Sequence, residues 1–136
     1  MMMNAMKQSI TLLCLAIACA GHAQELLQQD FYSNGHLKST RFSDGANERF
    51  ITYYESGRVK EMGAFREGRR DGVWKQLDEN GALLAQATFA QGHRQGVWEF
   101  RDNSNQLMGR LQYSNGQLAR GEQYDPRGEL LAQRQY

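Results

Sequence analysis

The chain repeats itself at an offset of 24 residues, and this repeat limits its fold more than any other feature. Residues 65–81 have the sequence FREGRRDGVWKQLDENG, and residues 89–105 have FAQGHRQGVWEFRDNSN. The pairs that match at this offset are Phe65 and Phe89, Gly68 and Gly92, Gly72 and Gly96, Val73 and Val97, Trp74 and Trp98, and Gly57 and Gly81. Such a period predicts an array of small structural units, each packed against the next.

The repeat extends in weaker form to both sides of these two copies. One further step of 24 leads from Phe89 to Tyr113 and from Gly92 to Gly116, and Gly35 precedes Gly57 by 22. We therefore expect one repeat domain over residues 24–136. Its approximate repeats are residues 30–50, 51–74, 75–98 and 99–124, followed by a partial repeat over 125–136.

Within a unit, apolar and polar residues alternate, which predicts a strand with one buried face. The alternate positions are Val59, Glu61, Gly63 and Phe65 in one copy, Leu83, Ala85, Ala87 and Phe89 in the next, and Leu107, Gly109, Leu111 and Tyr113 in a third. Large residues stand at the ends of this face and small ones in its middle. We expect the small positions to admit a bulky cross-strand neighbour, with Trp74 and Trp98 as the candidates.

A second strand is expected in each unit, over residues 72–78 and 96–102. Short segments ending in glycine, such as residues 55–57 and 79–81, are typical of hairpin turns. The connection over residues 67–72 has a glycine at two positions, which favours a wider turn with positive φ. Two strands and two turns per repeat predict an all-β fold: an elongated, single-layer antiparallel meander of stacked hairpins of roughly 24 residues each.

Residues 1–23 have the three-part plan of a secretory signal peptide. Lys7 precedes an apolar stretch over residues 10–20, and small residues lead to a cleavage site after Ala23, which would make Gln24 the first mature residue. We expect an N-terminal signal helix that is removed, and a periplasmic or secreted protein. The alternative is a membrane-anchored lipoprotein, because the residues before Cys19 partly match a bacterial lipobox.

Charge and composition exclude several classes of function. The chain has 16 Lys and Arg against 15 Asp and Glu, a formal net charge of +1, so it lacks the basic field of a nucleic-acid binder. Both cysteines, Cys14 and Cys19, lie in the expected signal, so a disulfide or a catalytic thiol is not expected in the mature chain. No cofactor-binding motif is present, and we expect no cofactor.

The pattern F-x-x-G-x-x-x-G-x-W, followed by a turn and a strand, resembles the variant MORN repeats of bacterial YwqK-like antitoxin proteins. The residues that carry the resemblance are Phe65, Gly68, Gly72, Trp74 and Gly81 in one copy, and Phe89, Gly92, Gly96 and Trp98 in the next. The resemblance spans roughly residues 30–136, with Phe50 in place of tryptophan in the first copy and shifted glycines near Tyr124 in the last. It implies a sheet of stacked hairpins and a role in protein contact, scaffolding, lipid contact or toxin neutralisation, without a shared catalytic residue.

Candidate catalytic residues are scattered. His36 and His93 are single turn histidines, whereas a zinc site needs three or four convergent ligands, so no metal site is expected. Acids such as Asp78 and Asp102 begin turns, where they cap the backbone. The serines also lie in turns, and no G-x-S-x-G elbow is present. We therefore expect a protein that is not an enzyme.

Two groups of residues remain as binding candidates. Arg66, Arg69 and Arg70, with Arg94 one repeat later, are weak candidates for an anion site, because interleaved acids nearly cancel their charge. The aromatic row consists of Phe65, Trp74, Phe89, Trp98, Phe100, Tyr113 and Tyr124. These rings are expected to form core, because the chain has few other apolar residues, although a stripe of rings also suits a sugar or a peptide.

The sequence therefore predicts an exported, non-catalytic repeat protein that acts as a protein-binding, envelope-surface-binding or scaffold module. A partner would contact one sheet face or the exposed edge strands. The alternative is an antitoxin or immunity-type protein that neutralises a partner toxin, as the family resemblance implies.

Overall fold

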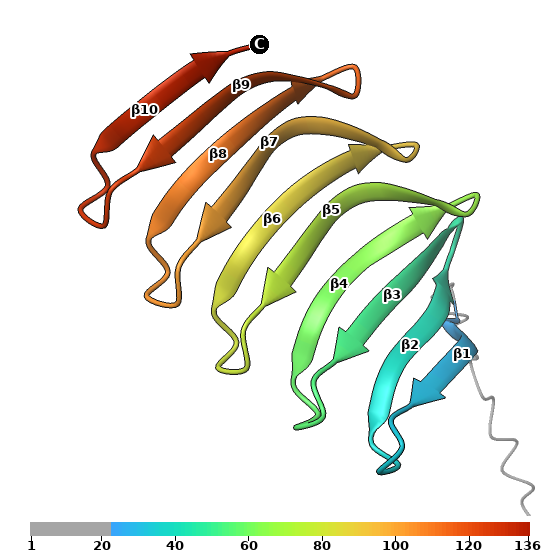
Figure 1. The fold of residues 1–136 in the computed structure, drawn as a ribbon. Coiled ribbons are helices and arrows are strands. Elements are labelled where there is room, and N and C mark those ends of the chain that lie inside the picture. The colour runs from blue at the N-terminus through green and yellow to red at the C-terminus, as the bar shows by residue number, and fades with distance from the viewer. Residues whose placement is uncertain (1–22) are drawn as a thin grey trace, which may run out of the picture.

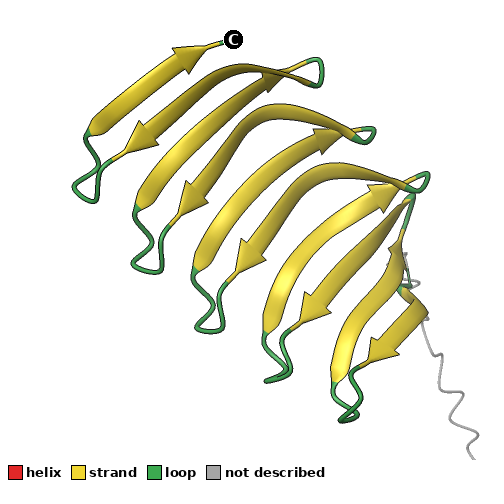
Figure 2. Cartoon of the chain, in the orientation of Figure 1, coloured by secondary structure: helices red, strands yellow, loops and turns green. Residues whose placement is uncertain are grey.

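The computed structural model describes residues 23–136, which form one antiparallel sheet of ten strands in sequential order (Figure 1). The strands are β1 (Glu25–Phe31), β2 (Leu37–Asp44), β3 (Asn47–Tyr53), β4 (Val59–Arg66), β5 (Arg69–Leu77), β6 (Leu83–Ala90), β7 (His93–Arg101), β8 (Leu107–Ser114), β9 (Gln117–Tyr124) and β10 (Leu130–Gln135). Figure 2 shows strands and loops only over this range. The predicted all-β meander is confirmed; the expected signal helix lies outside the described residues.

The two kinds of turn are exchanged relative to the sequence prediction. Glu67 and Gly68 form a tight two-residue turn with φ of 51° and 74°, the type I′ geometry that suits a hairpin. The strand after it already begins at Arg69, rather than at Gly72. The prediction of a wide turn over residues 67–72 is therefore wrong.

Gly72 lies inside β5 at a β-bulge. The strand register between β4 and β5 shifts between Met62 and Ala64, and Gly72 has a φ of 73°. Between the pairs Met62–Lys75 and Ala64–Asp71, β4 has one residue and β5 has three, so the bulge adds two residues to β5. Bulges often place a glycine in this left-handed region. The second positive-φ glycine of the motif thus bends a strand instead of extending a turn, and Gly96, with a φ of 66°, has the corresponding place in β7.

The segments ending in Gly57 and Gly81 form the longer turns. In the turn that begins at Asp78, the Asp78 amide donates to the Ala82 carbonyl at 2.9 Å, and the Gly81 amide donates back to the Asp78 carbonyl at 3.0 Å. The Asp78 side chain accepts from the Asn80 and Ala82 amides at 2.8 Å each. Asp102 and Asp125 cap their turns in the same way, as the sequence predicted for acids at turn starts.

The core is a single row of rings along one face of the sheet, which we call the aromatic face. Consecutive members of the row have ring centroids between 5.0 and 6.4 Å apart. The row runs from β3 to β8 through Phe50, Phe65, Trp74, Phe89, Trp98 and Tyr113. Trp74 and Tyr113 are the most buried of these rings, with 3% and 7% of their surface exposed. A single layer thus gains its burial from neighbouring rings instead of from a second layer.

Candidate functional site

A shallow groove of about 170 Å³ lies on the aromatic face, over strands β5, β6 and β7. Its floor is made by the small side chains of Ala85 and Ala87 on β6. Because an alanine leaves space where its neighbours carry rings, the groove follows directly from the small positions in the middle of the repeat.

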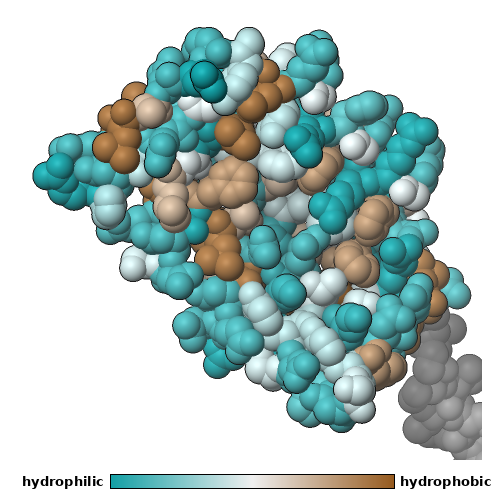
Figure 3. All heavy atoms as spheres, in the orientation of Figure 1, coloured by the Kyte–Doolittle hydropathy of each residue, from teal (hydrophilic) through white to brown (hydrophobic). Residues whose placement is uncertain are grey.

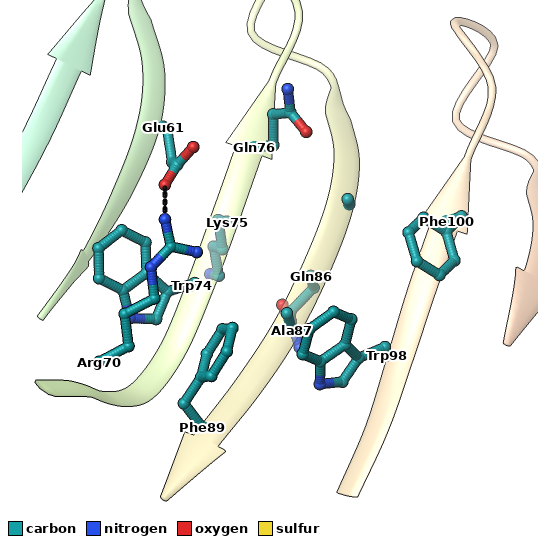
Figure 4. Close-up of a pocket in the computed structure, with 11 residues that line it drawn as sticks. Glu61, Arg70, Trp74, Lys75, Gln76, Gln86, Ala87, Phe89, Trp98 and Phe100 are labelled. Atoms are coloured by element: carbon teal, nitrogen blue, oxygen red, sulfur yellow. Dashed lines mark hydrogen bonds and ion pairs between the residues drawn. The ribbon is translucent and has the colours of Figure 1, made fainter. Parts of the chain in front are cut away.

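Rings form the two sides of the groove, as Figure 4 shows. Trp74 and Phe89 line one part, and Trp98 and Phe100 line the other. Phe100 is the most open of these rings, with 38% of its surface exposed. The sequence placed Phe100 among the core aromatics, but it lies directly opposite Ala85, whose small side chain leaves the ring uncovered.

Each tryptophan is held by its own hydrogen bond. The Trp74 indole N–H donates to the Ala64 carbonyl at 3.2 Å, and the Trp98 indole N–H donates to the Thr88 carbonyl at 3.0 Å. Both carbonyls belong to the strand before the tryptophan. The indoles are therefore fixed across that strand, which keeps the sides of the groove in place.

Arginine side chains cover the rings of the aromatic face. The Arg70 guanidinium lies 4.1 Å from the centroid of Trp74 and donates to the Glu61 carboxylate at 3.4 Å (Figure 4). The Arg94 guanidinium lies 5.5 Å from the centroids of both Trp98 and Tyr113. These distances are those of cation–π contacts.

Arg70 and Arg94 differ in whether a carboxylate pairs with the guanidinium group. Arg70 is paired with Glu61, whereas Arg94 donates to the Tyr113 hydroxyl at 3.3 Å and has no carboxylate partner among residues 23–136. A further arginine on this face, Arg41, is paired with Glu48 at 3.5 Å. Arg94 thus gives this part of the aromatic face an uncompensated positive charge.

The four arginines predicted from the sequence do not form one site. Arg70 and Arg94 lie on the aromatic face, whereas Arg66 and Arg69 lie opposite each other beside the tight turn at Glu67. That turn forms a separate hollow of about 240 Å³ with Gln91. Tyr124 also departs from the aromatic row: its hydroxyl donates to the Glu122 carboxylate, which raises the pKa of Tyr124.

The opposite face of the sheet carries charged pairs on β7 and β8. Glu99 accepts from Arg101 at 3.1 Å and from Arg110 at 3.0 Å. Burial raises the pKa of Glu99, but the hydrogen bonds from the two arginines outweigh this effect and leave the pKa below its ordinary value. Val97 on this face has 46% of its surface exposed and lies among polar neighbours. In Figure 3, hydrophobic residues form separate patches within a mostly hydrophilic surface.

Some kinds of site are absent from the described part of the chain. No three His, Cys, Asp or Glu side chains of residues 23–136 are placed to hold a metal ion. Within the same range, no helix is long and apolar enough to cross a membrane. Sequence reasoning missed the groove itself, because it depends on how Ala85, Ala87 and the rings align across three strands.

Two crystal structures are among the similar chains that a comparison with known structures finds. One is a crystal structure of an S. aureus TarM mutant in complex with fondaparinux, alpha-GlcNAc-glycerol and UDP, with 6% sequence identity, a TM-score of 0.48 and 73% of this chain covered. The other is a crystal structure of TarM, with 7% identity, a TM-score of 0.47 and 72% covered. The match spans 21% of each of those chains. The comparison with curated proteins finds no match.

Residues 70–91 match the family described as MORN repeat variant. The matched segment begins in β5, passes through the longer turn and β6, and ends in the next tight turn, so it spans most of one period of the structural repeat. The alternation of a tight turn and a longer turn recurs along the described sheet, with the hairpins stacked in sequence order. The match to the MORN repeat variant family therefore covers most of one repeat of the sheet, within residues 70–91.

Proposed function

We infer that this protein is a non-catalytic binding module that holds a segment of a partner protein in the groove of the aromatic face. The observation that carries this proposal is the alanine floor of the groove between the rings of Trp74 and Phe100. An apolar side chain of a partner would fill that space and bury the exposed part of Phe100.

The exposure of the rings favours an apolar side chain over a sugar. Sugar binding on aromatic residues uses an accessible ring face, but Trp74 is 3% exposed and the Arg70 guanidinium lies over it. Trp98 is half-buried, with Arg94 above its ring. The groove is lined by Ala85 and by the exposed ring of Phe100, which suits a leucine, isoleucine or phenylalanine side chain.

The charge of Arg94 adds a second requirement. Because Arg94 has no carboxylate partner among the described residues, a carboxylate on the bound segment would gain a charge-assisted hydrogen bond. We therefore propose that the preferred segment has an acidic residue close to an apolar one. Such a pair would discriminate this groove from the charge-paired opposite face.

We further propose that the protein acts outside the cytoplasm, on the basis of the three-part signal in residues 1–23. Amino-terminal sequencing of the protein purified after export is expected to begin at Gln24. Recovery of a protein that begins with acylated Cys19 would replace the secreted form with a lipid-anchored one, and recovery of the intact chain would contradict export.

A peptide library displayed on phage tests the groove directly. Selection on the wild-type protein is expected to enrich peptides in which an aspartate or glutamate lies close to a large apolar residue. Binding should fall at least tenfold for Phe100→Ala and for Ala85→Leu, which fills the groove. Val97→Ala, on the opposite face, is the matched control and should bind as the wild type does. Enrichment of peptides insensitive to Phe100→Ala and Ala85→Leu would overturn the proposal.

The enriched peptide also identifies the natural partner. Proteins captured from the envelope fraction should contain the selected pattern, and the peptide should displace them. If the displaced protein is a toxin, the binding role becomes the neutralising one that the family resemblance implies.

A further inference from the structure

The described sheet begins and ends with half of a repeat unit. Each complete unit has a first strand, a tight turn and a second strand, as in the pairs β2–β3, β4–β5, β6–β7 and β8–β9. β10 is a first strand, because it follows a longer turn in which the Asp125 amide donates to the Glu129 carbonyl at 2.8 Å, as in the other units. β1 is a second strand, because it is followed by the longer turn over residues 32–36.

The two half-units are complementary. Beside a first strand the repeat places a second strand, and the outer side of β10 has no such neighbour among residues 23–136. Within this same range, the outer side of β1 correspondingly has no first strand beside it. We propose that β10 of one copy pairs with β1 of another, so that each contact completes one repeat unit and the sheet continues from copy to copy.

The exposure of Tyr136 supports this pairing. Phe65, Phe89 and Tyr113 are each the seventh residue counted from the start of a first strand, and Tyr136 has this place relative to Leu130. Tyr113 is 7% exposed beside Trp98, whereas Tyr136 is 66% exposed. Among the described residues, Tyr136 therefore lacks the cover that the other units give to their rings.

Both outer strands expose other apolar residues as well. All residues of β1 and β10 are exposed. The large apolar ones are Leu26, Leu27 and Phe31 on β1, and Leu130 and Leu131 on β10, with between 46% and 61% of their surface exposed. Neither strand contains the proline or lysine that commonly protects a sheet edge. No strand of residues 23–136 pairs with the outer side of β1 or β10, so both edges can accept another strand.

Charge favours head-to-tail pairing over pairing of like edges. On the aromatic face β1 carries Glu25, Gln28 and Asp30, and β10 carries Ala132 and Arg134. The register of the repeat places Arg134 opposite Gln28 of the next copy, between its two acids. Pairing of β1 with a second β1 would instead bring acids together, which is unfavourable.

Proline substitutions can block each edge separately. Successive backbone amides of an antiparallel strand point alternately to its two sides. The Tyr136 amide donates to the Ala119 carbonyl of β9 at 3.0 Å, so the amide of Gln133, three residues earlier, points outward from β10. When the same alternation is applied to β1, which is a second strand of the repeat, the Gln29 amide points outward from the sheet. Gln133→Pro and Gln29→Pro therefore remove one outward donor each and leave the inner hydrogen bonds in place.

The test is sedimentation of the protein expressed from its full coding sequence, without a tag next to β10. The wild type is expected to increase in mass with concentration, through a dimer to larger species or a closed ring. Each proline variant alone should remain a monomer, because it keeps only one competent edge. An equimolar mixture of the two should reach twice the monomer mass and no more.

Two outcomes would overturn the proposal. One is a wild type that stays monomeric up to its solubility limit, and the other is dimerisation of Gln29→Pro alone, which would show symmetric β10–β10 pairing. If either proline variant loses its β-sheet circular dichroism, Arg134→Glu replaces it. That variant should weaken association at least tenfold, and adding Asp30→Lys to the same chain should restore it; failure of the pair to restore association would also overturn the proposal.

Discussion

The indole of Trp74 lies over the backbone of Gly63. A Cβ built on Gly63 would fall 2.1 Å from the Trp74 Cδ2 atom and 2.3 Å from Cε2, distances that no side chain can adopt. Gly63 sits on β4 at the register shift against β5, so the absent side chain and the bulge together make room for the ring. The core of this one-layer sheet therefore depends on a position that has no side chain at all.

Substitution of Gly63 is expected to be costly for this reason. Gly63→Ala should destabilise the protein by about 1–3 kcal/mol or more, because the ring must move away from the Ala64 carbonyl that it bonds. Urea unfolding followed by tryptophan fluorescence measures the change. Gly121→Ala is the control: its Cβ would be 3.5 Å from the nearest side-chain atom, an ordinary contact, so the midpoint should change little. Equal effects at the two positions would contradict the packing described here.

Truncation of Trp74 is expected to remove much of the core. Trp74→Ala should cost about 3–5 kcal/mol, because the ring is 3% exposed and contacts Phe50, Phe65 and Phe89. Phe100→Ala should cost less than about 1.5 kcal/mol, because 38% of that ring is already exposed. Thermal unfolding of the two variants checks the difference. A near-neutral Trp74→Ala would show that the ring serves binding instead of packing.

The Asp102 cap is expected to stabilise its turn. The carboxylate accepts from the Ser104 amide at 2.8 Å and from the Gln106 amide at 2.9 Å. Asp102→Ala leaves both amides without this partner and should cost about 0.5–2 kcal/mol. Hydrogen exchange at these two amides should accelerate, while exchange in the turn at Asp78 stays unchanged. The exposed neighbour offers the control, since Asn103→Ala should alter neither rate.

Stability is expected to decrease in acid. Hydrogen bonds lower the pKa of Asp30, through Ser39 and Gln28, and the pKa of Asp125, through the backbone amides of Glu129 and Arg127. A carboxylate whose folded-state pKa is below its unfolded value stabilises the fold above the unfolded pKa, near 3.8, and this contribution is lost as the pH falls through the folded value. The urea midpoint should be nearly constant from about pH 7 to pH 5 and decline below about pH 4. A midpoint that rises on acidification would contradict these pKa directions.

Much of the architecture could be predicted from the residues alone. The 24-residue period and the alternation through Phe65, Phe89 and Tyr113 specify strands of defined length with one aromatic face, because side chains in a strand point alternately to its two sides. Small residues at Gly63 and Ala87 indicated where a bulky neighbour would fit. The pattern also predicted acids as turn caps, since this bond lies within a few residues of the chain.

The turn lengths and the groove could not be predicted in this way. Gly68 and Gly72 both require positive φ, but local sequence does not distinguish a tight turn followed by a bulge from one wide turn; the pairing of β4 with β5 decides this. Local sequence also does not separate the four arginines into two groups. In the structure Arg70 and Arg94 cover rings on the aromatic face, whereas Arg66 and Arg69 lie beside the tight turn.

The sequence by itself thus determined the repeat, the strand period and the identity of the rings, because these depend on spacing along one chain. The tertiary structure decided which rings remain exposed, that Arg70 but not Arg94 pairs with a carboxylate of the described residues, and where the groove opens. Those properties arise from the register between strands, and register is a relation between separate segments that each segment alone does not encode.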